Sequence, residues 1–145
     1  MKICVTGGAG YIGSHAVKIL SNQGHDVVVI DNLSTGYKEA IDSRATFYNV
    51  NIRDDEAVTK IFKEEAIKAV IHFAAFSIVP ESMEKPLKYY DNNVFGTSCL
   101  LKAMHNADVK YIIFSSTAAV YGEQRVMPIT EEMDERPTNA YGETK

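Results

Sequence analysis

Short apolar runs alternate along the chain with longer segments in which apolar residues recur every three or four positions. The short runs show little strict alternation of polar and apolar side chains, which is typical of strands buried on both faces of a parallel sheet. The sequence therefore predicts five strands, at residues 2–6, 26–31, 45–51, 68–74 and 109–116.

The longer segments carry apolar stripes with the spacing of amphipathic helices. Pro86 stands where it can open the third of these helices, and acidic residues 54–56 gather where the second begins, as the helix dipole favours. The interval after the second strand is short and rich in turn residues, so any helix there is brief. The predicted stripes are Ile12, Ala16, Ile19 and Leu20; Val58, Ile61, Phe62 and Ala66; and Leu87, Tyr90, Val94, Leu101 and Met104.

Alternating strands and helices indicate an α/β fold with a doubly wound parallel sheet, the Rossmann fold. The expected strand order is 3-2-1-4-5 with right-handed crossovers. A ligand is then expected where the order reverses, beyond the carboxyl ends of the first and fourth strands. Residues 1–145 are expected to form one domain, and the stretch from Ala118 onward, which has no period, is either a functional loop or disordered.

The 145 residues carry a net charge of −4 with both signs mixed. This balance favours neither a nucleic-acid partner nor a membrane surface. The first residues lead directly into glycines and do not form a signal peptide, and the longest apolar stretch, residues 69–79, is too short to span a bilayer. Cys4 and Cys99 lie among apolar residues and indicate buried thiols, and no two histidines have metal-ligand spacing. We expect a cytoplasmic protein without a metal site.

Four glycines fall within the stretch "VTGGAGYIGSH", between the first strand and the first helix. Gly7, Gly10 and Gly13 fit G-x-x-G-x-x-G, and Gly8 replaces Gly7 in the narrower G-x-G-x-x-G spacing. Such a turn needs a positive φ, and a diphosphate approaching the helix N-terminus leaves no room for a Cβ. The spacing alone is a weak signal, but its place between strand and helix predicts a dinucleotide site.

Asp31 ends the second strand, about 20 residues after the glycines, where a carboxylate can accept a hydrogen bond from a ribose 2′-hydroxyl. The same carboxylate would repel the 2′-phosphate of NADP. The next residues, from Asn32 to Thr35, offer no cation, and Lys38 is too far along the chain. The sequence therefore favours NAD.

Tyr141 and Lys145 are four positions apart and would share one face of a helix. A free tyrosine has a pKa near 10, and a nearby ammonium group can lower it toward neutrality in a dry site. The hydroxyl of Thr117 could share the proton path. On spacing alone, however, two exposed residues on a surface helix explain the pattern more simply.

Six blocks in order carry a resemblance: "TGGAGYIGSH", "VVVIDNLSTG", "VIHFAA", "PLKYYDNNVFGT", "FSSTAAVYG" and "AYGETK". Together they resemble the extended short-chain dehydrogenase/reductases, and most closely the UDP-hexose 4-epimerases. The resemblance implies NAD-dependent interconversion of UDP-glucose and UDP-galactose through oxidation at C4, rotation of the 4-keto sugar and re-reduction. It also implies a homodimer built partly on the third helix.

The resemblance implies a role for each matched position. Tyr141 would be the base, Lys145 would lower its pKa and hold the nicotinamide ribose, and Thr117 would hydrogen-bond the reacting hydroxyl. The expected contacts with NAD are Gly7, Gly10, Tyr11, Ile12 and Gly13 at the diphosphate, Asp31 and Asn32 at the adenosine ribose, Asn51 and Ile52 at the adenine, and Phe73, Ala74, Ala75, Ser77, Asn92 and Ser115 along the rest of the groove, with Tyr141 and Lys145.

The chain also departs from its relatives. Many have Asp in place of Asn51, and some have Lys in place of Ser77. Ala118 and Ala119 stand where related dehydratases and decarboxylases carry acidic residues, which makes those activities less favoured alternatives. Epimerases of this kind are about twice as long, so the chain resembles their N-terminal portion. Its alternative function is that of a non-catalytic NAD-binding module.

Overall fold

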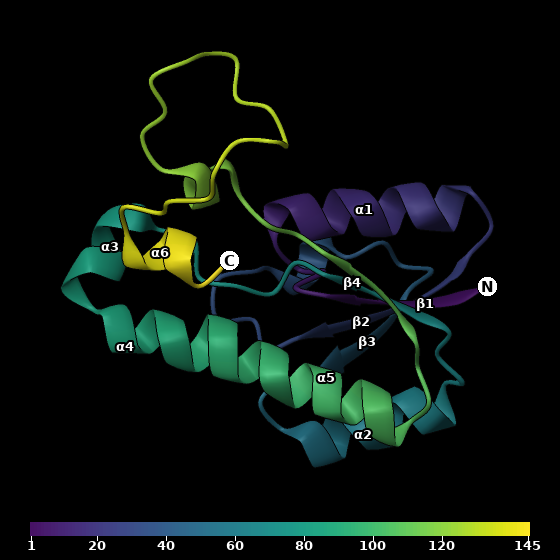
Figure 1. Cartoon of the computed structure of the whole chain (residues 1–145). Coiled ribbons are helices and arrows are strands. Elements are labelled where there is room, and N and C mark those ends of the chain that lie inside the picture. The colour runs from purple at the N-terminus through teal and green to yellow at the C-terminus, as the bar shows by residue number, and fades with distance from the viewer. The chain divides into compact units, whose positions relative to one another are not determined.

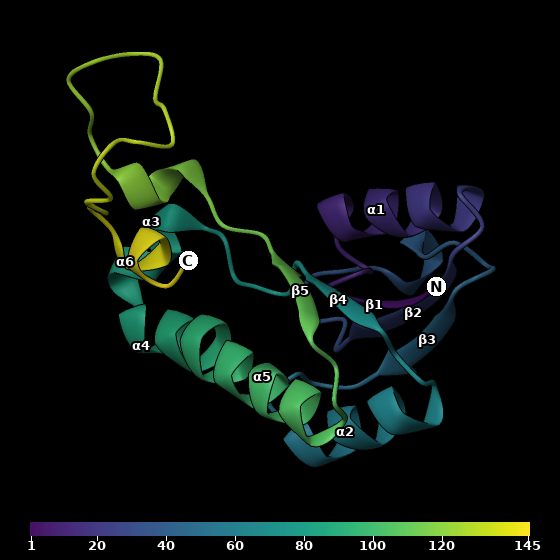
Figure 2. The ribbon, with the colours of Figure 1, turned by 45° about the vertical axis from the view of Figure 1, so that its right-hand side comes forward.

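The computed structural model describes residues 1–145 and contains one parallel sheet in the order β3-β2-β1-β4-β5. Figure 2 shows this order from one edge of the sheet to the other. The doubly wound fold and the strand order predicted from the sequence are both confirmed. The strands are β1 (Lys2–Thr6), β2 (Asp26–Asp31), β3 (Thr46–Asn49), β4 (Ala69–His72) and β5 (Tyr111–Phe114).

The first two strands have the predicted bounds, whereas the other three are shorter than predicted. Val109 shows the reason. It is buried in the core although it precedes β5, because an apolar side chain can pack without its backbone joining the ladder. Apolar runs in the sequence therefore mark burial more closely than they mark strand pairing.

The chain divides into two compact units. Unit 1 comprises residues 1–74 and 96–114 and holds the whole sheet. Unit 2 comprises residues 75–95 and 115–145. The prediction of a single domain over residues 1–145 stays a prediction.

Helices cover both faces of the sheet in unit 1. The helix α1 (Tyr11–Asn22) lies on one face, and α2 (Asp55–Glu64) and α5 (Gly96–Asn106) lie on the other (Figure 1). Because successive strand residues point to opposite faces, Cys4 and Val28 enter the core under α2 and α5, whereas Val5 and Val29 enter the core under α1. A short 3₁₀ helix, η1 (Lys38–Ala40), is the brief element predicted between β2 and β3.

The α2 helix follows its predicted stripe. Val58, Ile61 and Phe62 are buried, and the Asp54 side chain caps the helix by accepting a hydrogen bond from the Ala57 N–H at 3.0 Å. Ala66, the last predicted member of the stripe, is instead exposed beyond the end of the helix with φ +51°.

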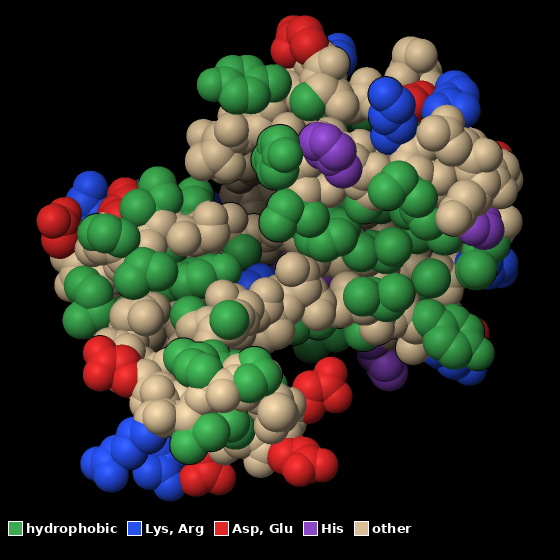
Figure 3. Space-filling view, turned by 90° about the horizontal axis from the view of Figure 1, so that it is seen from above, with side chains coloured by type: hydrophobic (Ala, Val, Ile, Leu, Met, Phe, Trp, Pro, Cys, Tyr) green, Lys and Arg blue, Asp and Glu red, His purple; other side chains and the backbone are tan.

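The α1 helix buries a different face from the predicted one. Gly13 and Val17 are buried, whereas Ile12 is 63% exposed and Ile19 is also exposed. A Cβ on Gly13 would overlap the carbonyl oxygen of Gly7, so close contact at this glycine fixes the face that α1 turns to the sheet. Figure 3 looks onto the α1 side of unit 1, where many hydrophobic side chains remain at the surface.

The third predicted helix is interrupted. The α4 helix (Pro86–Tyr89) begins at the predicted proline, but a π-helical segment, η2 (Tyr90–Phe95), separates it from α5. The wider π turn shifts the buried face. Tyr89, Asn93 and Leu100 are buried, whereas Leu87 of the predicted stripe is 81% exposed. Val94 and Leu101 are exposed as well.

Unit 2 also contains α3 (Val79–Glu84), the 3₁₀ helix η3 (Ala118–Tyr121) and α6 (Ala140–Glu143). The sequence pattern did not predict α3. Residues 122–139 form a long loop. Gly122 and Arg136 are in close contact at its base, since a Cβ on Gly122 would overlap the carbonyl oxygen of Arg136. None of the helices combines the length and the apolar character that crossing a membrane requires.

Candidate functional site

The glycine-rich turn after β1 is as tight as the sequence predicts. Gly7 has φ +74°, and a Cβ on it would lie 2.5 Å from the backbone nitrogen of Ala74. Its carbonyl oxygen accepts a hydrogen bond from the Gly10 N–H at 3.1 Å. Glycine is therefore required at position 7 by both conformation and space.

The N-terminus of α1 offers free backbone donors. Gly10 is the N-cap and makes no side-chain capping bond, so the N–H groups of Tyr11, Ile12 and Gly13 in the first turn have no acceptor within the helix. Position 10 is also open, since a Cβ there would approach only the Gly7 carbonyl oxygen, at 3.3 Å. This arrangement suits a phosphate group, which the helix dipole also favours.

Asp31 has a structural role at the end of β2. It is 9% exposed. Its Oδ2 accepts from the Ala9 N–H at 3.0 Å, and its Oδ1 accepts from the Leu33 N–H at 2.8 Å. The carboxylate thus holds the glycine-rich turn and the loop after β2 together, and each oxygen keeps a further lone pair for a ribose hydroxyl.

The other expected NAD contacts of unit 1 differ in their exposure and in the hydrogen bonds that their side chains already make. Asn32 is exposed and its Oδ1 accepts from the Ser34 N–H at 3.1 Å. The Oδ1 of Asn51 accepts from the backbone N–H of Arg53 at 3.0 Å. Ile52 is buried in the core, so only its backbone could face an adenine. Phe73 and Ala74 are half-buried directly after β4.

Thr117 lies in unit 2 as the N-cap of η3, and its Oγ1 accepts from the Ala119 N–H at 3.2 Å. It borders a hollow of about 590 Å³. The wall of this hollow combines hydroxyl and carboxylate groups, such as those of Thr130 and Glu131, with the apolar side chains of Val120 and Ile129. Such a lining can hydrogen-bond a polyhydroxylated ligand and also pack against its carbon skeleton.

Tyr141 and Lys145 also belong to unit 2. Asn139 caps α6 by accepting from the Gly142 N–H at 2.8 Å, and the Tyr141 N–H donates to Ser82 Oγ at 3.1 Å. The helix ends at Glu143, with Thr144 as C-cap, so the helix that would put both residues on one face does not reach Lys145. Burial lowers the pKa of the Lys145 ammonium group to about 8.

Asn93 is a residue of this region that the sequence analysis missed. It lies in η2 and is 3% exposed. Its Oδ1 accepts from the Phe76 N–H at 2.9 Å, and its Nδ2 donates to the Phe76 carbonyl oxygen and to Thr144 Oγ1, both at 3.0 Å. An asparagine on the buried side of a helix is the signal that could have identified it.

The remaining expected NAD contacts are Ala75, Ser77, Asn92 and Ser115. The Nδ2 of Asn92 donates to Asn93 Oδ1 at 3.0 Å, and the Asn92 side chain is half-buried. Ala75 and Ser115 are half-buried, and Ser77 is exposed. All belong to unit 2.

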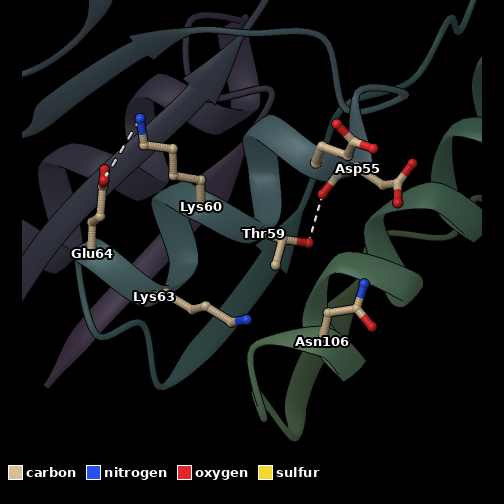
Figure 4. A pocket seen from close by; sticks show the side chains of 7 residues that line it. Asp55, Thr59, Lys60, Lys63, Glu64 and Asn106 are labelled. Carbon is tan, nitrogen blue, oxygen red and sulfur yellow. Dashed lines mark hydrogen bonds and ion pairs between the residues drawn. The ribbon is translucent and has the colours of Figure 1, made fainter.

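A hollow of about 400 Å³ between α2 and α5 contains none of the expected site residues. Figure 4 shows charged side chains of both signs along it, with an ion pair of 3.8 Å between Lys60 and Glu64. The hydroxyl of Thr59 is used within α2, where it donates to the Asp55 carbonyl oxygen at 2.6 Å. The charged and polar side chains of this hollow are those of a solvated helix surface.

A family model described as "NAD dependent epimerase/dehydratase family" matches residues 3–145. The chain belongs to this family. The UDP-glucose 4-epimerase of Lactobacillus helveticus is 57% identical over 145 residues, which are 100% of this chain and 44% of that protein. The chain thus spans less than half the length of the curated epimerases that it matches.

Solved epimerase structures agree with this assignment. UDP-glucose 4-epimerase from Brucella ovis in complex with NAD superposes with a TM-score of 0.96 at 45% identity, covering 99% of this chain and 44% of that one. The Thermotoga maritima enzyme with UDP-glucose gives a TM-score of 0.95 at 39% identity, covering 100% and 48%. NAD is the cofactor of this epimerase family, and the glycine turn, the open position 10 and the free helix N-terminus of this chain fit its diphosphate.

Proposed function

We propose that this chain carries the NAD-binding part and the proton-transfer groups of an enzyme that interconverts UDP-glucose and UDP-galactose. Two observations together carry the proposal. In unit 1 the N-terminus of α1 has free backbone N–H groups that suit a diphosphate, and unit 2 contains Thr117, Tyr141 and Lys145. Relatives whose names state this activity match the chain along its whole length, which supports the same substrates.

Within this proposal, the N–H groups of Tyr11 and Ile12 bind the diphosphate, and glycines 7, 10 and 13 allow its approach. Asp31 and Asn32 accept from the adenosine ribose, while Asn51 and the backbone of Ile52 border the adenine. The rest of the cofactor is held by Phe73, Ala74, Ala75, Ser77, Asn92, Ser115, Tyr141 and Lys145.

Tyr141 is proposed to take the proton from the sugar 4-hydroxyl. When bound, NAD would supply the hydride acceptor for C4 and the hydride donor for re-reduction of the 4-keto sugar on its other face. A tyrosine with an ordinary pKa near 10 needs about 4 kcal/mol of extra phenolate stabilisation to act near pH 7. The Lys145 ammonium supplies part of this, because an opposite charge in a poorly solvated site favours the phenolate.

The Thr117 hydroxyl is proposed to hydrogen-bond the reacting oxygen and to pass the proton between the sugar and Tyr141. The hollow beside Thr117 has room for a hexose ring. Ala118 and Ala119 follow directly and cannot donate or accept a proton, which opposes a dehydratase or a decarboxylase at this position.

A second function is supported by the share of the relatives that the chain covers. Since the chain matches 44% of their length, the 145-residue polypeptide alone is proposed to bind NAD without turnover. The whole enzyme is proposed to be a homodimer that uses the third-helix region and works in the cytoplasm. The two cysteines are buried thiols, which is consistent with a reducing compartment.

The deciding experiment combines NAD titration by calorimetry with an assay for conversion of UDP-galactose to UDP-glucose. We expect the 145-residue chain to bind one NAD and to give no steady turnover. Tyr141→Phe serves as the control for any trace activity. Absence of NAD binding would oppose both functions, whereas turnover abolished by Tyr141→Phe would show that the chain is a complete enzyme.

A further inference from the structure

His72 is the last residue of β4 and is 1% exposed. Both nitrogens of its ring contact a threonine hydroxyl. Nδ1 lies 2.6 Å from Oγ1 of Thr6, and Nε2 lies 3.0 Å from Oγ1 of Thr97. Thr6 is the last residue of β1, and Thr97 is in the first turn of α5. One buried side chain therefore connects two strands and a helix within unit 1.

The hydrogen-bond pattern of this triad is constrained. A neutral imidazole has one N–H donor and one acceptor nitrogen, so one threonine hydroxyl donates to the ring and the other accepts from it. The tautomer decides which threonine does which. In either case the ring holds the Thr6 side chain at the point where β1 ends.

Thr6 directly precedes Gly7, the residue with φ +74° on which the glycine-rich turn depends. Thr6 pairs with His72 in the β1–β4 ladder, and its carbonyl oxygen accepts from the Phe73 N–H at 2.9 Å. The Gly7 N–H donates to the Ile30 carbonyl oxygen at 2.9 Å. The turn that would receive the NAD diphosphate therefore starts from a residue fixed by both backbone and side chain.

We propose that His72 is a positioning residue for the cofactor, acting through Thr6 on the glycine-rich turn. The inference rests on the proposed diphosphate site at the N-terminus of α1. The contact of Nε2 with Thr97 holds the ring in place, while the contact of Nδ1 with Thr6 sets the turn. The two contacts thus have separable consequences.

Two substitutions of His72 separate these contacts. An asparagine amide reaches about the position of Nδ1, and a glutamine amide reaches about the position of Nε2. His72→Asn keeps the bond to Thr6 and loses that to Thr97, whereas His72→Gln does the reverse. Thr6→Val and Thr97→Val remove the same two hydroxyls from the other side at nearly constant shape.

We expect His72→Gln and Thr6→Val to weaken NAD binding by about five- to tenfold, as loss of one buried hydrogen bond implies. His72→Asn and Thr97→Val should leave the dissociation constant within about twofold. Urea unfolding of each variant separates this pattern from a loss of stability. Equal effects of His72→Asn and His72→Gln on NAD affinity would mean that His72 only fills the core.

Hydrogen exchange in the NAD-free chain gives an independent readout. His72→Gln and Thr6→Val should speed amide exchange at Gly7 and Gly10, while the amides of Val28 and Val70 in the strands keep their protection. His72→Asn should leave Gly7 and Gly10 protected. Unchanged exchange at these glycines in all variants would overturn the proposal. If the variants show the expected exchange pattern but the wild-type chain does not bind NAD, the proposed cofactor site is wrong. The role of His72 in positioning the glycine-rich turn then still holds.

Discussion

Asn93 donates a hydrogen bond to Thr144 across 3.0 Å, and this bond joins the π-helical segment to the end of the helix that carries Tyr141. Thr144 in turn donates from its Oγ1 to the Tyr141 carbonyl oxygen at 2.8 Å. Both side chains are buried. The position of the proposed catalytic tyrosine therefore depends on an asparagine almost 50 residues earlier in the chain.

Replacing Asn93 with alanine should be strongly destabilising. The change removes the partner of both backbone groups of Phe76 and leaves the Thr144 hydroxyl with one bond fewer in a buried place. We expect the free energy of unfolding in urea to fall by about 2–3 kcal/mol. The neighbouring Asn92→Ala is the matched control and should cost less than about 1 kcal/mol, because Asn92 is half-buried and makes one bond to Asn93. Equal losses for the two variants would contradict the role of the Asn93 hydrogen bonds to Phe76 and Thr144.

Asp31→Ala should weaken NAD binding by roughly 1.5–3 kcal/mol, because the ribose hydroxyls lose a charged acceptor. The same variant loses the bonds to the Ala9 and Leu33 N–H groups, so its stability must be measured alongside. Asp31→Asn is the sharper variant. Without the negative charge, the preference for NAD over NADP should fall about tenfold by calorimetry. An unchanged preference would leave Asp31 with only its structural role at the end of β2.

The pKa of Lys145 gives a stability change with a defined sign. Its pKa in the folded chain is about 8, below the ordinary 10.5, because burial disfavours the ammonium form. Between these two values the unfolded chain binds more protons, so this group makes the protein more stable as the pH rises from about 8 to 10.5. NMR of ¹³C-labelled lysine should show one midpoint near 8, absent in Lys145→Met. A midpoint near 10.5 for Lys145 would contradict the burial of its ammonium group.

Glu65 joins Lys2 and Tyr48 in a hydrogen-bond network within unit 1. Its Oε2 accepts from Lys2 Nζ at 2.8 Å and its Oε1 from the Tyr48 hydroxyl at 2.6 Å, and these bonds lower the Glu65 pKa. The Glu65 contribution to stability is therefore complete above its ordinary pKa of 4.5 and disappears as the pH falls through the lowered value.

Tyr48→Phe tests this network from the other side. The hydrogen bond to Glu65 raises the pKa of Tyr48 to about 12, so its stabilising effect is present below pH 10 and is lost between about 10 and 12. We expect the variant to lose about 1 kcal/mol of unfolding free energy at pH 7. At low pH, where Glu65 is protonated, and at high pH, where Tyr48 is ionised, its unfolding free energy should approach that of the wild type. A difference that stays constant with pH would indicate packing of the ring instead.

Two glycines with positive φ form a matched pair. Gly24 has φ +80°, and a methyl group added there would meet no neighbouring atom, whereas a Cβ on Gly122 at φ +61° would overlap the Arg136 carbonyl oxygen. Gly24→Ala should cost about 1 kcal/mol from the backbone conformation alone. Gly122→Ala should cost clearly more, about 2–4 kcal/mol, because the base of the loop must open. Thermal unfolding of the two variants side by side measures the difference, and equal shifts would mean that the loop yields freely.

The sheet could be predicted from the sequence because the apolar runs are short, unbroken and separated by helical periods. The first two strands and the Val58, Ile61 and Phe62 positions of the α2 stripe are determined by local pattern, and the structure agrees with them. The buried faces of α1 and of the third helix could not be predicted in this way. At Gly13 a close backbone contact overrides the apolar stripe, and at Asn93 a π turn rotates a polar side chain inward.

The candidate site was predictable to the extent that its chemistry depends on local motifs. The glycine spacing and Asp31 identified the turn, and the structure gives both a tight geometry. The supporting bonds join residues far apart in the chain, such as Asp31 with Ala9, His72 with Thr6 and Asn93 with Thr144. No periodicity in the sequence encodes such pairs, since they arise only when the strands and helices are assembled.

The loop that closes at Gly122 and Arg136 lies beside Thr117, because Ile129, Thr130 and Glu131 border the same hollow as Thr117. Within the loop, Gln124 Nε2 donates to the Asp134 carbonyl oxygen at 3.1 Å, so the two sides of the loop base are held near each other. A change at residues 129–131 therefore alters the wall of the hollow beside Thr117. Arg125, Val126 and Met127 do not border this hollow, and this part of the loop is the natural place in unit 2 to insert a tag or a fluorophore.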